Sequence, residues 1–180
     1  TMYQMKRSAT LSLITLISGA YLLNLVYPEF YDYTALFGPL VDAGEVWRLF
    51  TVALVHGGLT HLFFNMFSLL LLGNPIEAAL GKVRFLVIFF TSLLTGSLAS
   101  IYLTNELYVS VGASGAIFGL FGAFIALRKR INDGVRDIYV IVGLNFVFGF
   151  ILGGVDWRAH LGGLVGGYLT TAVLLRITRV

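Results

Sequence analysis

The chain carries no charged side chain between Arg84 and Glu106. A helix of about 20 apolar residues crosses the ~30 Å hydrocarbon core of a bilayer, and this stretch fits that length. The whole chain has the same character, because 58% of its 180 residues are hydrophobic and only 12% are charged. Soluble domains carry roughly twice that charged fraction. The sequence therefore predicts an integral membrane protein, and the absence of cysteine excludes disulfides and thiolate chemistry.

Apolar stretches recur along the chain and predict an all-α, polytopic six-helix bundle in a single domain, residues 1–180. The first stretch has features of a signal peptide, but it continues to Tyr27, so we expect an uncleaved helix. The connection from Pro28 to Gly58 is long enough to suggest a functional or interfacial loop. The predicted spans are Leu11–Tyr27, Leu59–Leu80, Phe85–Leu103, Ala113–Leu127, Ile138–Leu152 and Ala159–Leu175.

The basic residues predict the orientation of these spans. With the N-terminus in the cytoplasm, ten of the twelve basic residues fall inside, and only Arg48 and Arg158 fall outside. The positive-inside rule then predicts that both termini are cytoplasmic. This segregated charge suits contact with anionic lipid and not with nucleic acid. The ten inside residues are Lys6, Arg7, Lys82, Arg84, Arg128, Lys129, Arg130, Arg136, Arg176 and Arg179.

Spans two, four and six all run inward from the outer face, and each has polar residues near its start. Counting back from the cytoplasmic basic residues at 1.5 Å per residue gives a depth for each polar side chain. Ser114, His160 and Asn65 all come out roughly 5–10 Å below the outer boundary. His61 lies one turn before Asn65 on the same helix face. Ionisable side chains at such depth usually mark function, so their coincidence predicts a site.

The glycines near these polar residues have a packing interpretation. Small residues four apart let membrane helices approach closely, and the pairs Gly115/Gly119 and Gly163/Gly167 have this spacing. If spans four and six meet through these faces, Ser114 and His160 come within reach of each other. Gly112 permits a backbone angle that other residues disfavour.

A serine and a histidine at one depth favour nucleophilic catalysis, because a base must take the hydroxyl proton. We expect a Ser114–His160 dyad, with Asp156 in the outer loop and no third catalytic member. The developing oxyanion needs donors, and the Ser114 amide, Asn65 and His61 are the candidates.

Three alternatives stay open at this point. His56, His61 and His160 could bind zinc, but no H-E-x-x-H pattern accompanies them, so we predict no metal and no cofactor. A transporter also places polar groups at mid-depth, but its second half should repeat them. A non-catalytic membrane-remodelling relative would be expected to have lost Ser114 or His160.

Five motifs resemble the rhomboid family of intramembrane serine proteases in its minimal six-span prokaryotic form. They extend from the first loop through span six, roughly from Glu45 to Gly167. Each motif alone is weak, but their order along the chain is specific. The motifs are Trp47-Arg48, His56-Gly-Gly-Leu-Thr-His61-Leu-Phe-Phe-Asn65, Gly73-Asn-Pro-Ile-Glu77-Ala-Ala-Leu-Gly81, Gly112-Ala113-Ser114-Gly115 and Ala159-His160-Leu-Gly-Gly163-Leu-Val-Gly-Gly167.

The resemblance implies Ser114 as nucleophile, His160 as base, and an oxyanion hole formed by Asn65, His61 and the Ser114 amide. It implies cleavage of membrane-spanning protein substrates near the outer face of a bacterial or archaeal cell membrane. Phe118 stands where many members have a tyrosine that packs on the histidine.

Further expectations concern the surroundings of this site. His56 would support the loop or the site, and Gly112, Gly115 and Phe118 would shape it. Trp47 and Arg48 would anchor the first loop at the lipid headgroups, because indole rings favour that interface. Span five is a candidate gate, through Phe146, Phe148 and Phe150, and the loop 153–158 could cap the cavity.

Overall fold

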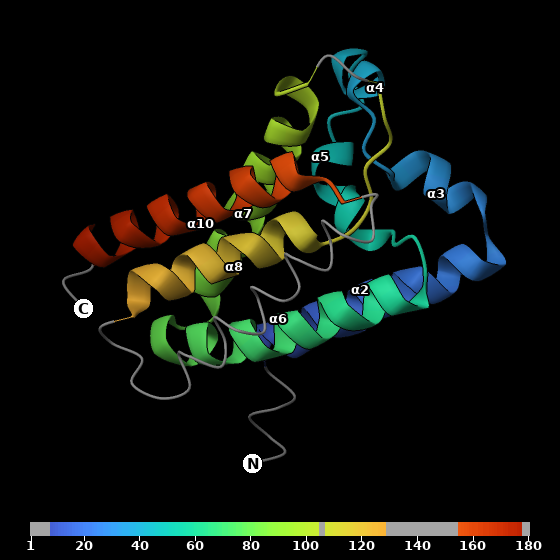
Figure 1. Cartoon of the computed structure of the whole chain (residues 1–180). Coiled ribbons are helices and arrows are strands. Elements are labelled where there is room, and N and C mark those ends of the chain that lie inside the picture. Colours follow the sequence, from blue (N-terminus) through green and yellow to red (C-terminus); the bar gives the residue numbers. More distant parts are fainter. Residues whose placement is uncertain (1–7, 105–106, 129–154, 178–180) are drawn as a thin grey trace.

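The computed structural model describes residues 8–104, 107–128 and 155–177 (Figure 1). In these ranges the secondary structure is helical, apart from one isolated antiparallel bridge between Leu36 and Ser110. The long helices match the predicted spans within three residues at each end, and α6 matches at both ends. The helices are α2 (Ala9–Val26), α3 (Glu29–Thr34), α4 (Gly38–Asp42), α5 (Arg48–Thr51), the 3₁₀ turn η1 (Val52–Leu54), α6 (Leu59–Leu80), α7 (Lys82–Tyr102), α8 (Ser114–Leu127) and α10 (Trp157–Ile177).

Four of these helices, α2, α6, α7 and α10, are long and apolar enough to cross a membrane. The chain is therefore a polytopic helical membrane protein. Helix α8 has 14 residues and is only about 21 Å long, so it falls short of a ~30 Å core. The predicted span Ile138–Leu152, with its candidate gate residues, lies outside the described residues. The six-span arrangement and the side of the termini stay predictions.

The connection between α2 and α6 folds into the short helices α3, α4 and α5 with η1. Arg48 holds this connection together from inside: its side chain pairs with Glu45 and donates to the Ala35 carbonyl at 2.8 Å. Because Arg48 is buried, the expected contact with lipid headgroups is wrong for this residue. Trp47 stays exposed and donates its indole N–H to the Tyr33 carbonyl at 3.0 Å.

Helix α2 is attached to the far end of α6 by one carboxylate. Glu77 accepts the backbone N–H groups of Ala9 at 2.7 Å and Thr10 at 2.9 Å, and the hydroxyls of Ser8 and Thr10. The first amides of a helix have no partner within the helix, and an acceptor there also complements the helix dipole. Glu77 therefore caps α2 from a neighbouring helix, 67 residues away from Thr10 in the sequence.

Helix α10 packs against α7 and α8 at backbone distance, and the glycine spacing predicted the contact with α8. A Cβ added at Gly163 would collide with the Gly115 carbonyl, and one at Gly167 with the Gly119 carbonyl. A second glycine face of α10 meets α7, because a Cβ at Gly162 or Gly166 would collide with Thr95. Figure 1 shows α8 and α10 running side by side. This packing sets the separation of the helices that carry Ser114 and His160.

Candidate active site

Ser114 is the first residue of α8, and the turn before it is held by backbone bonds. Gly112 has φ +110°, a value that favours glycine, and its N–H donates to the Val52 carbonyl at 3.0 Å. The expectation of an unusual backbone angle at Gly112 is confirmed. Ser114 therefore stands at the end of α8 where the amides lack partners within the helix and the dipole favours negative charge.

His56 contacts this turn directly. Its Nε2 accepts the Ala113 N–H at 3.4 Å, so the ring proton is assigned to Nδ1. The side chain is only 3% exposed, and burial, with the nearby His61 second, lowers the pKa of His56 to about 3. A neutral ring is required for this bond, because a protonated imidazole has no acceptor. His56 thus supports the backbone immediately before Ser114.

His61 and Asn65 approach the same turn from the first two turns of α6. A Cβ added at Gly112 would lie 3.0 Å from His61 Nε2 and 3.7 Å from Asn65 Nδ2. His61 Nδ1 accepts the Gly57 N–H at 3.3 Å, which assigns the ring proton to Nε2. Both side chains therefore present N–H donors beside the backbone two residues before Ser114. Only a residue without a side chain fits at position 112.

His160 stacks on Phe118. The ring centroids are 4.1 Å apart and the planes are 14° from parallel. Phe118 follows Ser114 by four residues, so both lie on one face of α8. Ala159, the residue before His160, also lies close to α8, because a Cβ at Gly115 would be 3.5 Å from the Ala159 carbonyl oxygen. The expected packing of Phe118 against His160 is confirmed.

The site has buried and accessible parts. His56, Asn65 and His160 are each at most 7% exposed, whereas Ser114 and His61 are half-buried. The first three side chains are enclosed by their neighbours, and the other two are partly accessible to solvent. Zinc is disfavoured on chemical grounds, because His56 and His61 each use the lone pair of one ring nitrogen to accept a backbone N–H.

Asp156 makes more contacts within the fold than the sequence analysis predicted. Expected in the outer loop, it directly precedes α10, and its carboxylate accepts the Ala159 N–H and the hydroxyls of Ser100 and Ser110. An aspartate just before a helix is a common N-cap, a signal that could have been recognised. The bonds to Ser100 and Ser110 join residues 56 and 46 apart, which no local pattern reveals.

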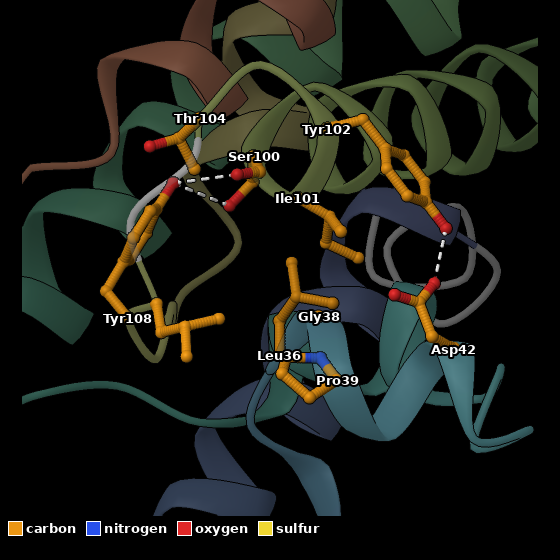
Figure 2. Close-up of a pocket in the computed structure, with 10 residues that line it drawn as sticks. Leu36, Gly38, Pro39, Asp42, Ser100, Ile101, Tyr102, Thr104 and Tyr108 are labelled. Atoms are coloured by element: carbon orange, nitrogen blue, oxygen red, sulfur yellow. Dashed lines mark hydrogen bonds between the residues drawn. The ribbon is translucent and has the colours of Figure 1, made fainter.

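A pocket of about 140 Å³ lies beside this network, between α4 and the end of α7 (Figure 2). Tyr102 bonds to Asp42 on one side of it, and the Tyr108 hydroxyl bonds to Ser100 on the other. None of the predicted site residues lines it. The pocket and the Ser114 site are therefore separate.

Known proteins resemble this chain over most of its length. Residues 43–177 match the family model described as the Rhomboid domain. The chain is 41% identical over 140 residues to the Rhomboid protease GluP of Bacillus subtilis, covering 75% of this chain and 27% of that protein. It is 41% identical over 135 residues to the Putative rhomboid protease YdcA of the same organism, covering 72% of this chain and 67% of that protein. The chain thus spans only about a quarter of the length of the first relative.

One relative has a different functional description. The Inactive RHOMBOID-like protein 8 of Arabidopsis thaliana is 36% identical over 143 residues, which cover 76% of this chain and 40% of that protein. The family therefore includes a member described as inactive, and catalysis by this chain depends on the residues that it carries itself.

Proposed function

Because the chain belongs to the rhomboid family, we propose that it is an intramembrane serine endopeptidase with Ser114 as nucleophile and His160 as general base. The observation that supports this most is the stack of His160 on Phe118, one turn along α8 from Ser114. That stack holds the base over the helix face that carries the hydroxyl. Ser114 is only partly buried, so its hydroxyl is accessible from outside the fold.

The proposed reaction has two stages. His160 takes the proton from Ser114 as Oγ attacks the scissile carbonyl, and the resulting tetrahedral intermediate carries an oxyanion. His160 then gives the proton to the leaving amine, and the C–N bond breaks to leave an acyl-enzyme. Water, deprotonated by His160, attacks the acyl carbon and releases Ser114 with its proton restored.

The oxyanion would be stabilised by donors that are already in place. His61 Nε2–H and the Asn65 amide lie beside the turn that precedes Ser114, and the Ser114 N–H stands at the start of α8. Fixed donors aimed at developing charge are usually a large contribution to catalysis. His61 is oriented for this by the Gly57 amide on its other ring nitrogen.

We extend the proposal to topology and substrate. The apolar stretches favour six spans, and the ten-to-two division of basic residues favours cytoplasmic termini. Ser114 then faces the outer side, and the substrates are single-pass membrane proteins cut near that face. Their helices must unwind before attack, so helix-weakening residues should favour cleavage. The setting is the lipid bilayer of a bacterial or archaeal cell membrane.

Labelling with a serine-reactive fluorophosphonate or isocoumarin tests the assignment without knowledge of the substrate. We expect the folded protein to be labelled at Ser114, and Ser114→Ala and His160→Ala to lose both labelling and cleavage of a reconstituted transmembrane substrate. Ser12→Ala is the matched control, because that exposed hydroxyl lies in α2 and, within the described residues, donates to the Ser8 carbonyl one turn earlier. A folded protein that neither reacts nor cleaves would favour a non-catalytic role.

A further inference from the structure

One carboxylate joins the two chain segments that lead to the proposed catalytic side chains. Asp156 Oδ1 caps α10 by accepting the Ala159 N–H at 3.1 Å. Its Oδ2 accepts the Ser110 hydroxyl at 2.9 Å and also the Ser100 hydroxyl at the end of α7. Asp156 precedes His160 by four residues, and Ser110 precedes Ser114 by four. The Asp156–Ser110 bond therefore spans from the base helix to the nucleophile segment.

The Ser110 end of this bond is well fixed. Its backbone N–H and carbonyl exchange bonds of 2.9 and 3.0 Å with Leu36. The Tyr108 hydroxyl donates to the Ser100 carbonyl at 3.0 Å, as Figure 2 shows. These bonds hold residues 108–110 in place. A displacement of Asp156 would therefore strain or break its bond to Ser110.

The first turn of α10 has another bond to α7, which makes a useful comparison. Arg158 Nε donates to the Leu103 carbonyl at 3.0 Å on the exposed side of the turn. This bond holds α10 against α7 but does not reach residues 108–113. The Asp156 carboxylate, by contrast, joins the start of α10 to Ser110, in the segment just before Ser114.

We propose that Asp156 is a positioning residue, which sets the placement of His160 relative to Ser114 through the backbones of α10 and the 108–113 segment. This rests on the proposed function of Ser114 and His160. Bonds to an ionised acceptor are shorter and stronger than neutral ones, which suits the carboxylate to this task. Because a misplacement of 1 Å can cost about 100-fold in rate, a bond outside the reaction centre can control catalysis.

The test measures the rate of fluorophosphonate labelling of Ser114 in the full chain, well below the unfolding temperature. We expect Asp156→Ala and Ser110→Ala to lower the second-order rate about 10- to 100-fold. Asp156→Asn should lose less, because its amide oxygen can still cap α10. Arg158→Ala is the matched control and should label at the wild-type rate.

A second readout does not depend on catalysis. With 4-fluorophenylalanine at position 118, the fluorine resonance reports the stack on His160, and Asp156→Ala and Ser110→Ala should shift or broaden it. Wild-type labelling rates in both variants, or an unchanged fluorine signal, would overturn the proposal. An unlabelled wild-type protein would instead contradict the proposed function, and the fluorine signal would still decide whether Asp156 positions His160.

Discussion

Two helix pairs in this molecule are held together by different physics. Helices α8 and α10 meet at backbone distance through Gly115, Gly119, Gly163 and Gly167. Helix α2 is attached at its first turn by the hydrogen bonds of Glu77. Lipid tails are as apolar as leucine, so membrane helices associate through close packing and polar bonds. Close glycine contacts hold the helices that carry Ser114 and His160, whereas α2 is held on α6 by a polar cap beside one close contact, that of Thr10 with Gly73.

The largest expected effect comes from opening the close-packed pair. Gly163→Val should destabilise the protein by about 3 kcal/mol or more, because the new Cβ would coincide with the Gly115 carbonyl and force the helices apart. Unfolding by SDS titration in mixed micelles measures the loss. Gly19→Ala in α2 is the control, since no atom lies within 4 Å of the added Cβ. Equal stability of the two variants would contradict the comparison.

Removing the cap of α2 should have the next largest effect. We expect Glu77→Ala to lower the free energy of unfolding by about 2–3 kcal/mol, because it leaves the Ala9 and Thr10 amides without their charged acceptor. Glu77→Gln keeps an acceptor oxygen and should lose less. At temperatures where the variant is folded, labelling of Ser114 should stay near the wild-type rate. A large loss of labelling without loss of stability would show that α2 acts on the site.

The stack between α8 and α10 should affect rate more than stability. Phe118→Leu keeps an apolar side chain but removes the ring under His160, and we expect about a 10-fold fall in the labelling rate, equivalent to about 1.4 kcal/mol. Phe118→Tyr should stay within a few-fold of wild type, because the ring remains. Both variants are compared at matched folded fraction. A wild-type labelling rate in Phe118→Leu would show that the stack does not contribute to the reaction.

The smallest effect is a dependence of stability on pH from His56. The folded pKa is about 3 and the ordinary value is 6.5, so between these values the unfolded chain binds one more proton. The stabilisation is complete above pH 6.5 and decreases as the pH falls towards 3. From pH 6.5 to 5.5 this amounts to about 1 kcal/mol.

His56→Gln tests the assignment, because its amide oxygen can accept the Ala113 N–H without titrating. The unfolding free energy of the wild-type protein should fall more steeply than that of the variant between pH 7 and 5. Equal slopes would mean that His56 is not the group responsible.

The sequence alone predicted the long helices of the described residues and the candidate site residues, for a physical reason. Bilayer thickness sets how long an apolar run must be, and α6 was predicted at both ends from that rule. Helical spacing placed His61 above Asn65, and four-residue spacing predicted the contact faces of Gly115 and Gly163. These signals are local or periodic, so a single chain displays them. The catalytic roles of Ser114 and His160 stay predictions until labelling tests them.

Only the tertiary structure decided how those residues are supported. The His56 bond to Ala113 joins residues 57 apart, and the Asp156 bond to Ser110 joins residues 46 apart. The burial of Arg48 within its loop depends on the Ala35 carbonyl and the Glu45 carboxylate of the same folded connection. Such contacts are set by how helices pack, and neither hydropathy nor periodicity records them. The sequence thus supplied the candidate site residues, and the packing of α6, α7, α8 and α10 decided which contacts support them.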